Sequence, residues 1–412
     1  MAEKLTNEQQ AAVDSRERSL LVSAAAGSGK TKVLVERLFS YVEREGANLD
    51  DFLIITYTRA AASELRGKIA KALTERMERD PGNYHLRQQM LRVYRADIKT
   101  VDAFCTALLR ENCHLLGEDA RGHALRPDFR VLDENEAQVL RERVLARTLD
   151  DFYDCPTPGG TLLADTLGAG RDDSALEDLV LELHAKLQAQ PYEDEWLEAQ
   201  RAFWRAVPDK IEDTPYGKIL LNEVRRKARH CKNLLQRAAQ EMCANDALNQ
   251  KYAPAFLDAS YQLEALEGKT AEGWDAARGV TIAFPRLAAV KDSDGGEMKA
   301  RMKSLWDNCK ETVKGFAEIF SASSDEAVED LRTMASAMLA LIDLTADFSR
   351  RYNEEKRRRN SADFSDQEHE AIRLLIGEDG APTELARIVS ARYREIMVDE
   401  YQDTNEVQNR IF

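Results

Sequence analysis

The segment Ala24–Thr31 constrains the fold of this chain more than any other feature. Its residues are small up to Lys30, so backbone N–H groups can surround an anion, and it matches a phosphate-binding loop with alanine in place of the first glycine. An apolar run, Ser19–Ser23, precedes the loop, and a helical pattern, Lys30–Glu45, follows it. Strand, loop and helix in this order predict the opening of a nucleotide-binding α/β domain, with Ser19–Ser23 as a buried strand.

The side chains at the end of this loop suit nucleotide chemistry. Lys30 can reach the β and γ phosphates, and the hydroxyl of Thr31 can ligate magnesium. The alternative is an ordinary Gly/Ala turn that happens to end in Lys-Thr. The residues expected to hold the phosphates are Ala24, Ala25, Ala26, Gly27, Ser28, Gly29, Lys30 and Thr31.

Strand and helix patterns go on alternating over roughly the first 110 residues. Phe52–Thr56 and Ile98–Thr100 are predicted as strands, and Arg59–Arg79 and Val101–Asn112 as helices. Repeated strand–helix units indicate a parallel sheet with helices on its faces.

A long helical segment then interrupts the pattern. Asp133–Glu136 is a capping box that opens a helix, and the residues after it are charged, rich in Leu and Ala, and helical in period. Glu395–Val398 is again a short apolar strand. We therefore expect an α/β parallel-sheet domain in 1–130, an all-α insertion domain in 131–355 and a return to the first domain in 356–412. Because that return has barely begun at Phe412, we expect the N-terminal part of a longer protein.

Two carboxylates follow the last predicted strand. Asp399 and Glu400 stand at its carboxyl end, where α/β sheets place their ligands. Asp399 would hold magnesium, usually through water, and Glu400 would orient or deprotonate an attacking water. Asp-Glu pairs after apolar runs are common, so this pair indicates a nucleotide site only in combination with the upstream phosphate loop.

Gln9 has two interpretations. In one, Thr6 and Gln9 form a capping box that satisfies backbone donors at a helix start. In the other, the Gln9 amide, which both donates and accepts, reads the edge of an adenine.

Charge and cysteine content limit the kinds of ligand and the cellular compartment that fit this chain. The net charge of −15 disfavours a protein that binds nucleic acid through bulk positive charge. Residues 58–101 nevertheless form a basic strip, and Arg350–Arg359 a basic run; either could face a polyanion or be a solvated helix face. Six scattered cysteines without a Cys-x-x-Cys pair suggest neither a zinc site nor a disulfide framework, and they fit a reducing cytoplasm.

An ordered set of motifs resembles the early motifs of the UvrD-like superfamily 1 DNA helicases. Within that superfamily, the long helical insertion and Gly170–Asp173 resemble the AddA family of helicase–nuclease subunits rather than the shorter UvrD and PcrA proteins. The motifs are Leu5–Val13, Ala24–Thr31, Thr56–Arg66, Ile98–Cys105, Asp363–Asp366 and Val398–Asn405.

The resemblance implies a RecA-like ATPase domain that uses ATP and Mg²⁺ to move along single-stranded DNA and unwind duplex ends in double-strand break repair by homologous recombination. It implies a bacterial cytoplasmic protein with a nuclease and an AddB-type partner subunit in a heterodimer. The second lobe with its arginine finger would lie beyond residue 412, so we expect 1–412 to be inactive alone. The alternatives are a UvrD- or PcrA-type repair helicase, or only a nucleotide- and DNA-binding module.

Roles follow residue by residue from the same resemblance. Gln9 would read adenine, Lys30 and Glu400 would be catalytic, Thr31 and Asp399 would bind the metal, and Gln402 would couple the γ-phosphate to domain closure. Asp102 departs from many relatives, which have His there. The DNA-binding residues would be Tyr57, Thr58, Arg59, Thr100 and Asp102.

Overall fold

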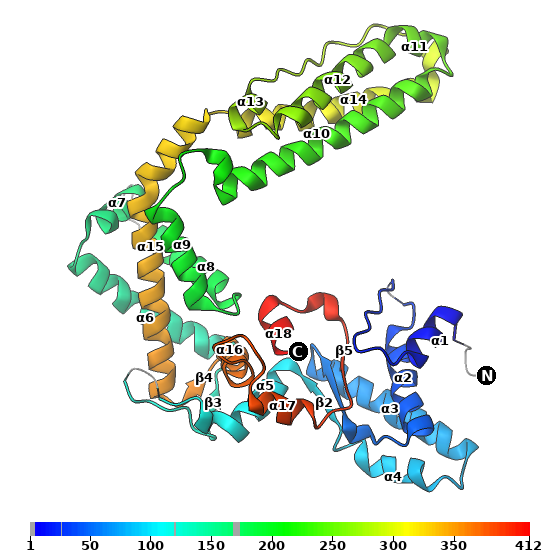
Figure 1. The fold of residues 1–412 in the computed structure, drawn as a ribbon, viewed down its shortest axis with the longest axis vertical. Helices are drawn as coiled ribbons and strands as arrows, with labels where there is room; N and C mark the ends of the chain where they lie inside the picture. Colours follow the sequence, from blue (N-terminus) through cyan, green and yellow to red (C-terminus); the bar gives the residue numbers. More distant parts are fainter. Residues whose placement is uncertain (1–4, 26, 119–120, 168–173) are drawn as a thin grey trace. The chain divides into compact units, whose positions relative to one another are not determined.

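The computed structural model describes residues 5–25, 27–118, 121–167 and 174–412 (Figure 1). The predicted loop residue Ala26 and the segment Gly170–Asp173 lie outside these ranges. The described residues are mostly helical and form two small parallel sheets, one of three strands and one of two. Among the described residues, no helix combines the length and the apolar character that crossing a membrane requires.

Two compact units make up the chain. Unit 1 is Met1–Cys155, Arg171–Leu197 and Asp343–Phe412, and unit 2 is Pro156–Gly170 and Glu198–Ile342. The shorter helices and 3₁₀ turns are α1 (Asn7–Asp14), η1 (Leu49–Asp51), η2 (Cys113–Leu115), α7 (Pro158–Leu167), α8 (Ser174–Gln188), α9 (Glu193–Arg205), η3 (Ile211–Asp213), α11 (Asp246–Lys251), α13 (Trp274–Arg278), α17 (Glu384–Ser390), η4 (Tyr401–Asp403) and α18 (Glu406–Ile411).

The sheet of unit 1 has three parallel strands in the order β2-β1-β5. They are β1 (Phe52–Thr56), β2 (Asp97–Thr100) and β5 (Glu395–Val398), so the three strands predicted in these places are confirmed. The central β1 is buried along its whole length. Ile54 lies opposite Ile98 on one side and Met397 on the other, which joins the end of the chain to its beginning.

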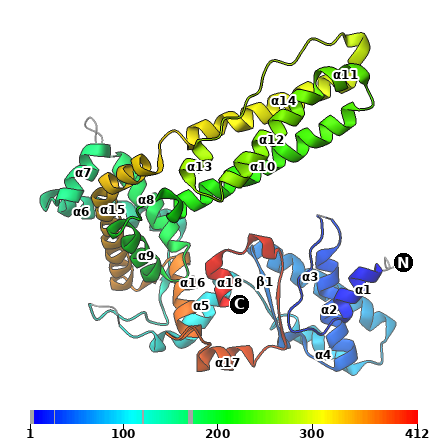
Figure 2. The same cartoon turned by 45° about the horizontal axis from the view of Figure 1, so that its top comes forward.

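Helices cover both faces of this sheet (Figure 2). On one face, Phe52 and Ile54 pack with the helices α2 (Lys30–Glu45), α3 (Arg59–Arg79) and α4 (Tyr84–Arg92). On the other, Leu53 and Ile55 pack with α5 (Val101–Asn112), α16 (Phe364–Leu375) and α17. Successive side chains of a strand point to opposite faces, so an unbroken apolar run such as β1 suits a sheet buried on both sides.

The predicted strand at Ser19–Ser23 is wrong. These residues form no strand, and Leu21 is 76% exposed. The segment has the hydrophobicity of a buried strand but makes no ladder hydrogen bonds within the described chain, and an apolar run becomes a strand only where a neighbour pairs with it. The helix predicted after the phosphate loop is confirmed as α2, which ends at a left-handed Gly46.

Unit 1 also contains part of the long helical segment. A second sheet pairs β3 (Arg130–Val131) with β4 (Ser361–Ala362), and the predicted capping box opens α6 (Glu134–Asp154). Helix α15 (Ser324–Arg358) contributes its C-terminal half, where Phe348 and Tyr352 pack against His184 of α8. The units divide the chain at other places than the predicted boundaries 130 and 355, because α6 and the end of α15 both belong to unit 1.

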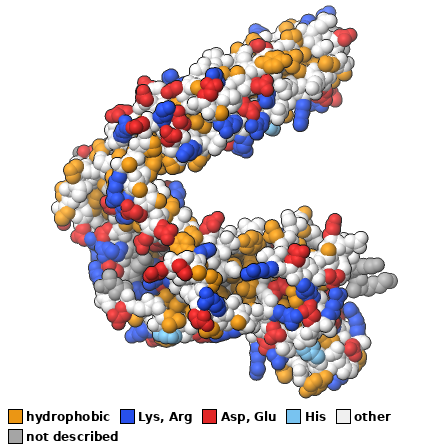
Figure 3. All heavy atoms as spheres, viewed as in Figure 1, with side chains coloured by type: hydrophobic (Ala, Val, Ile, Leu, Met, Phe, Trp, Pro, Cys, Tyr) orange, Lys and Arg blue, Asp and Glu red, His pale blue; other side chains and the backbone are white. Residues whose placement is uncertain are grey.

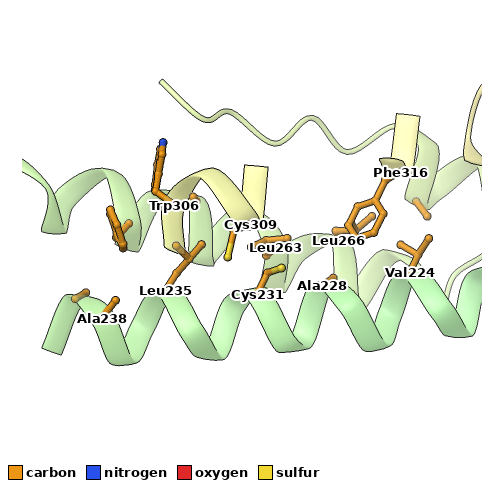
Figure 4. Close-up of a cluster of buried hydrophobic side chains, with 14 of the residues drawn as sticks. Val224, Ala228, Cys231, Leu235, Ala238, Leu263, Leu266, Trp306, Cys309 and Phe316 are labelled. Carbon is orange, nitrogen blue, oxygen red and sulfur yellow. The ribbon is translucent and has the colours of Figure 1, made fainter. Parts of the chain in front are cut away.

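Unit 2 is built on three helices, α10 (Pro215–Met242), α12 (Ala253–Lys269) and α14 (Asp292–Ile319). Val224, Ala228, Cys231 and Leu235 of α10 recur at helical spacing and point into the core that Figure 4 shows. Trp306 of α14 stacks on Phe256 of α12 with ring centroids 4.8 Å apart. Unit 2 therefore has a hydrophobic core of its own.

Candidate functional site

The carboxyl ends of β1 and β5 lie side by side at one edge of the sheet. The backbone N–H of Asp399 donates to the carbonyl oxygen of Ile55 at 3.0 Å, which extends the ladder just beyond β5. Asp399 and Glu400 therefore start from the same edge as Tyr57, which directly follows β1. Parallel sheets of this kind bind ligands outside the carboxyl ends of their strands.

The phosphate-loop segment reaches the same edge through Lys30. The Nζ atom of Lys30 lies 3.5 Å from the Oε2 atom of Glu400. The structure therefore brings together two predicted site residues from opposite ends of the sequence. Gly27 and Gly29 have φ angles of 76° and 85°, a left-handed conformation that favours glycine, and Gly29 leads into the first turn of α2.

The surroundings of Glu400 favour its charged form. It adopts a left-handed backbone conformation with φ of 54°, and the side-chain amide of Gln402 donates to its Oε2 atom. This hydrogen bond, together with the charge of Lys30, keeps the pKa of Glu400 below its ordinary value. An ionised carboxylate in this position can accept a proton from a water molecule.

Asp399 has the opposite electrostatic environment. Burial raises the pKa of Asp399 and the charge of Glu400 adds to this, while the backbone N–H of Glu400 donates to its Oδ1 atom at 3.1 Å and lowers the pKa. Lys30 and Lys68 also lower it. Sequence analysis did not identify Lys68 of α3, whose charge acts on Asp399 although its ammonium pairs with Glu64. Such a carboxylate gains from a cation, and a magnesium ion would supply one.

Gln9 forms the predicted capping box of α1. Its Oε1 atom accepts from the backbone N–H of Thr6 at 2.9 Å, and the hydroxyl oxygen of Thr6 accepts from the N–H of Gln9 at 3.2 Å. The Nε2 atom of Gln9 also donates to the carbonyl oxygen of Ser28 at 2.9 Å. The capping interpretation is confirmed, and the same amide lies against the phosphate loop; the contact with adenine stays a prediction.

The residues predicted to grip DNA surround the end of β1. The hydroxyl of Tyr57 is hydrogen-bonded to the hydroxyl of Thr404, a contact that sequence analysis missed. Thr58 caps α3 by accepting from the N–H of Ala61 at 3.0 Å, and Arg59 is exposed. An aromatic ring beside an exposed guanidinium can contact a base and a phosphate.

Thr100 and Asp102, the other two predicted DNA-binding residues, lie where β2 passes into α5. Thr100 is buried and caps α5 by accepting from the N–H of Ala103 at 3.2 Å. Burial raises the pKa of Asp102, and the nearby charge of Arg59 opposes this effect. Thr100 therefore has a sufficient structural role without DNA, and the DNA contacts of both residues stay predictions.

The basic run Arg350–Arg359 is largely neutralised within unit 1. Lys356 is buried, with its Nζ atom 2.9 Å from an oxygen of Asp363 and 2.6 Å from one of Asp366. Arg350 and Arg351 pair with Asp347, Arg357 with Glu370, and Arg358 and Arg359 with Glu355. On the face that Figure 3 shows, basic and acidic side chains are interspersed. Lys356 therefore belongs neither to a polyanion-binding patch nor to a solvated helix end.

Comparisons with known proteins agree with these motifs. The model of the UvrD/REP helicase N-terminal domain matches residues 5–412. An ATP-dependent helicase/nuclease subunit from Acetivibrio thermocellus is 33% identical over 99% of this chain and 33% of its own length. The protein of the same description from Desulfitobacterium hafniense is 36% identical over 99% of this chain and 30% of its own length. The chain thus spans about a third of the length of these curated relatives.

Proposed function

This chain belongs to the family of the UvrD/REP helicase N-terminal domain, and on that premise we propose that its sheet edge binds ATP with Mg²⁺ and uses hydrolysis to drive movement on DNA. The observation that carries the proposal is the approach of Lys30 to Glu400, which brings the phosphate loop and the Asp-Glu pair into one site. The donors fit a magnesium nucleotide: a helix N-terminus, an ammonium group, a hydroxyl and two carboxylates.

Each side chain has a role in this proposal. Lys30 would neutralise the β and γ phosphates, and Thr31 and Asp399 would hold the magnesium ion, which polarises the phosphoryl group when bound. Glu400, kept ionised, would orient the attacking water and accept its proton. Gln402 would position Glu400 through the hydrogen bond already present. Gln9, beside the loop, would read the adenine edge.

Single-stranded DNA would bind next to this site. We place the Tyr57 ring against a base, and Thr58 and Arg59 against phosphates. We keep Thr100 and Asp102 as the neighbouring part of this surface, because both stand at the same sheet edge, where β2 passes into α5.

The activity of the whole protein is a further part of the proposal. The relatives are named as ATP-dependent helicase/nuclease subunits, which supports a helicase that works with a nuclease and with at least one other subunit. We propose in addition that the whole protein is bacterial and cytoplasmic, has an AddB-type partner, and unwinds duplex ends in double-strand break repair by homologous recombination. We also propose that helical segment 131–355 is an insertion in a RecA-like ATPase domain.

Steady-state ATP hydrolysis by the full-length protein, with and without single-stranded DNA, tests this function. We expect DNA to stimulate hydrolysis and Glu400→Gln to abolish the stimulated rate. Binding of nucleotide and DNA without hydrolysis would instead indicate a binding module, and hydrolysis indifferent to DNA would contradict the motor.

A further inference from the structure

Tyr57 and Thr404 connect two motifs that the proposed function assigns to different ligands. Tyr57 begins the segment proposed to hold DNA, and Thr404 follows the acidic pair proposed to hold magnesium and water. Their hydroxyl groups share a hydrogen bond, and both side chains are half-buried. The hydroxyl of a tyrosine, with an ordinary pKa of about 10, is protonated at neutral pH, and burial raises the pKa of Tyr57 further.

The short turn η4 ties Thr404 to Glu400. The N–H of Asp403 donates to the carbonyl oxygen of Glu400 at 2.9 Å, and the N–H of Thr404 donates to that of Tyr401 at 3.1 Å. The Gln402 amide donates to the Glu400 carboxylate from within the same turn. These three hydrogen bonds connect Glu400 to Thr404 within a single turn.

The other end of this connection is Lys30, whose ammonium lies 3.5 Å from the Glu400 carboxylate. A bound phosphate and the Glu400 carboxylate would compete for the same ammonium group. Beyond Thr404, helix α18 is anchored separately, because Gln408 donates to Glu368 of α16 at 2.7 Å. The turn η4 thus lies between the Lys30–Glu400 pair and helix α18, and a chain of contacts runs from Lys30 through Glu400 and the turn to Tyr57.

We propose that the hydrogen bond between Tyr57 and Thr404 is the link through which nucleotide at Lys30 and Glu400 changes the affinity of the Tyr57 ring for single-stranded DNA. This inference rests on the proposed function and states how binding of one of its two ligands changes the affinity for the other. Thr404 is a positioning residue: it fixes the hydroxyl of Tyr57 and so the plane of the ring on which a base would stack. Phenylalanine at position 57 could stack but could not make this bond.

Coupling between two ligands is reciprocal and is measured as a ratio of affinities. The experiment titrates residues 1–412 with a fluorescent oligothymidylate, in the presence and absence of saturating AMPPNP and Mg²⁺. The ratio of the two dissociation constants in the wild-type chain should differ from one. Tyr57→Phe and Thr404→Val, which keep ring and shape, should each move that ratio toward one by about two- to tenfold, the effect of a single neutral hydrogen bond. The double variant should show no further change.

Two further variants separate coupling from a merely structural role. Thr404→Ser retains the hydroxyl and should restore the wild-type ratio. Tyr393→Phe removes another tyrosine hydroxyl that bonds to the sheet, from the Tyr393 hydroxyl to Asp97 of β2 at 2.7 Å, and should leave the ratio unchanged. A wild-type ratio of one, or a ratio that Thr404→Val leaves unchanged while both ligands still bind, would overturn the inference and leave the proposed function standing. A chain that binds neither nucleotide nor DNA would overturn the proposed function, and the inference with it.

Discussion

The ammonium of Lys30 lies 3.5 Å from the carboxylate of Glu400, so the phosphate loop and the acidic motif contact each other directly. The pair is partly exposed, with 28% and 48% of the two side chains accessible to solvent. Water screens such a pair, so phosphate can displace Glu400 from Lys30 at little cost. The contact is thus compatible with nucleotide entry.

The Glu400 variant separates binding from hydrolysis. Glu400→Gln removes the carboxylate that competes with phosphate for Lys30, so we expect binding of an ATP analogue to 1–412 to stay the same or tighten up to about fivefold, while the full-length protein loses hydrolysis. Fluorescence titration and a phosphate-release assay measure the two effects. Glu384→Gln, at the start of α17 and paired with Arg387, serves as the control. Normal turnover in Glu400→Gln would mean that another group activates the water.

The buried ion cluster predicts a stability effect away from the nucleotide site. Lys356→Met leaves Asp363 and Asp366 without their cation in the core, and we expect it to lower the free energy of unfolding by about 3–5 kcal/mol. Chemical denaturation followed by circular dichroism measures the change. Arg358→Met, whose exposed guanidinium pairs with Glu355, should change stability little. Equal losses in the two variants would contradict the importance of burial.

His369 predicts a pH dependence. Its Nε2 and Nδ1 atoms each lie 2.9 Å from a carbonyl oxygen, of Gln190 and Ser365, and since carbonyls only accept, these two contacts favour a ring that carries both protons. Burial opposes this charge, but Glu193, the two carbonyls and Asp366 outweigh it and raise the pKa of His369.

A raised pKa in the folded state adds stability that is fully present below the unfolded pKa of about 6.5 and is lost as pH rises through the folded value. The difference in unfolding free energy between the wild type and His369→Gln should therefore be larger at about pH 5.5 than at about pH 8.5. A difference independent of pH would show that folding leaves the pKa of His369 unshifted, and a difference larger at high pH would show that folding lowers it.

The core of unit 2 predicts a packing effect. Phe256 is fully buried against Trp306, so Phe256→Ala should cost about 3–5 kcal/mol in the unfolding of unit 2. Tryptophan fluorescence during denaturation reports this transition. Tyr261→Ala, on the same helix but 62% exposed, should stay within about 0.5 kcal/mol of wild type. Similar losses for both would argue against a packed core here.

Most of the elements at the sheet edge could be predicted from the sequence, because each of them has a recognisable local pattern. The loop Ala24–Thr31, helix α2 and strand β5 each carry their own pattern of small, periodic or apolar residues. The strand at Ser19–Ser23 failed because pairing, which no local pattern contains, decides whether an apolar run becomes a strand. The bond between Tyr57 and Thr404 and the burial of Lys356 were missed for a related reason, since their partners become neighbours only through the tertiary fold.

Binding of Mg²⁺-AMPPNP to residues 1–412, measured by calorimetry for the wild type and Lys30→Ala, tests whether this sheet edge is the nucleotide site. We expect saturable, magnesium-dependent binding that Lys30→Ala weakens by about ten- to a hundredfold, because a charge-assisted contact with phosphate is lost. Lys71→Ala, an exposed lysine of α3, should bind like the wild type. Unchanged affinity in Lys30→Ala would contradict the assignment of this sheet edge as the nucleotide site.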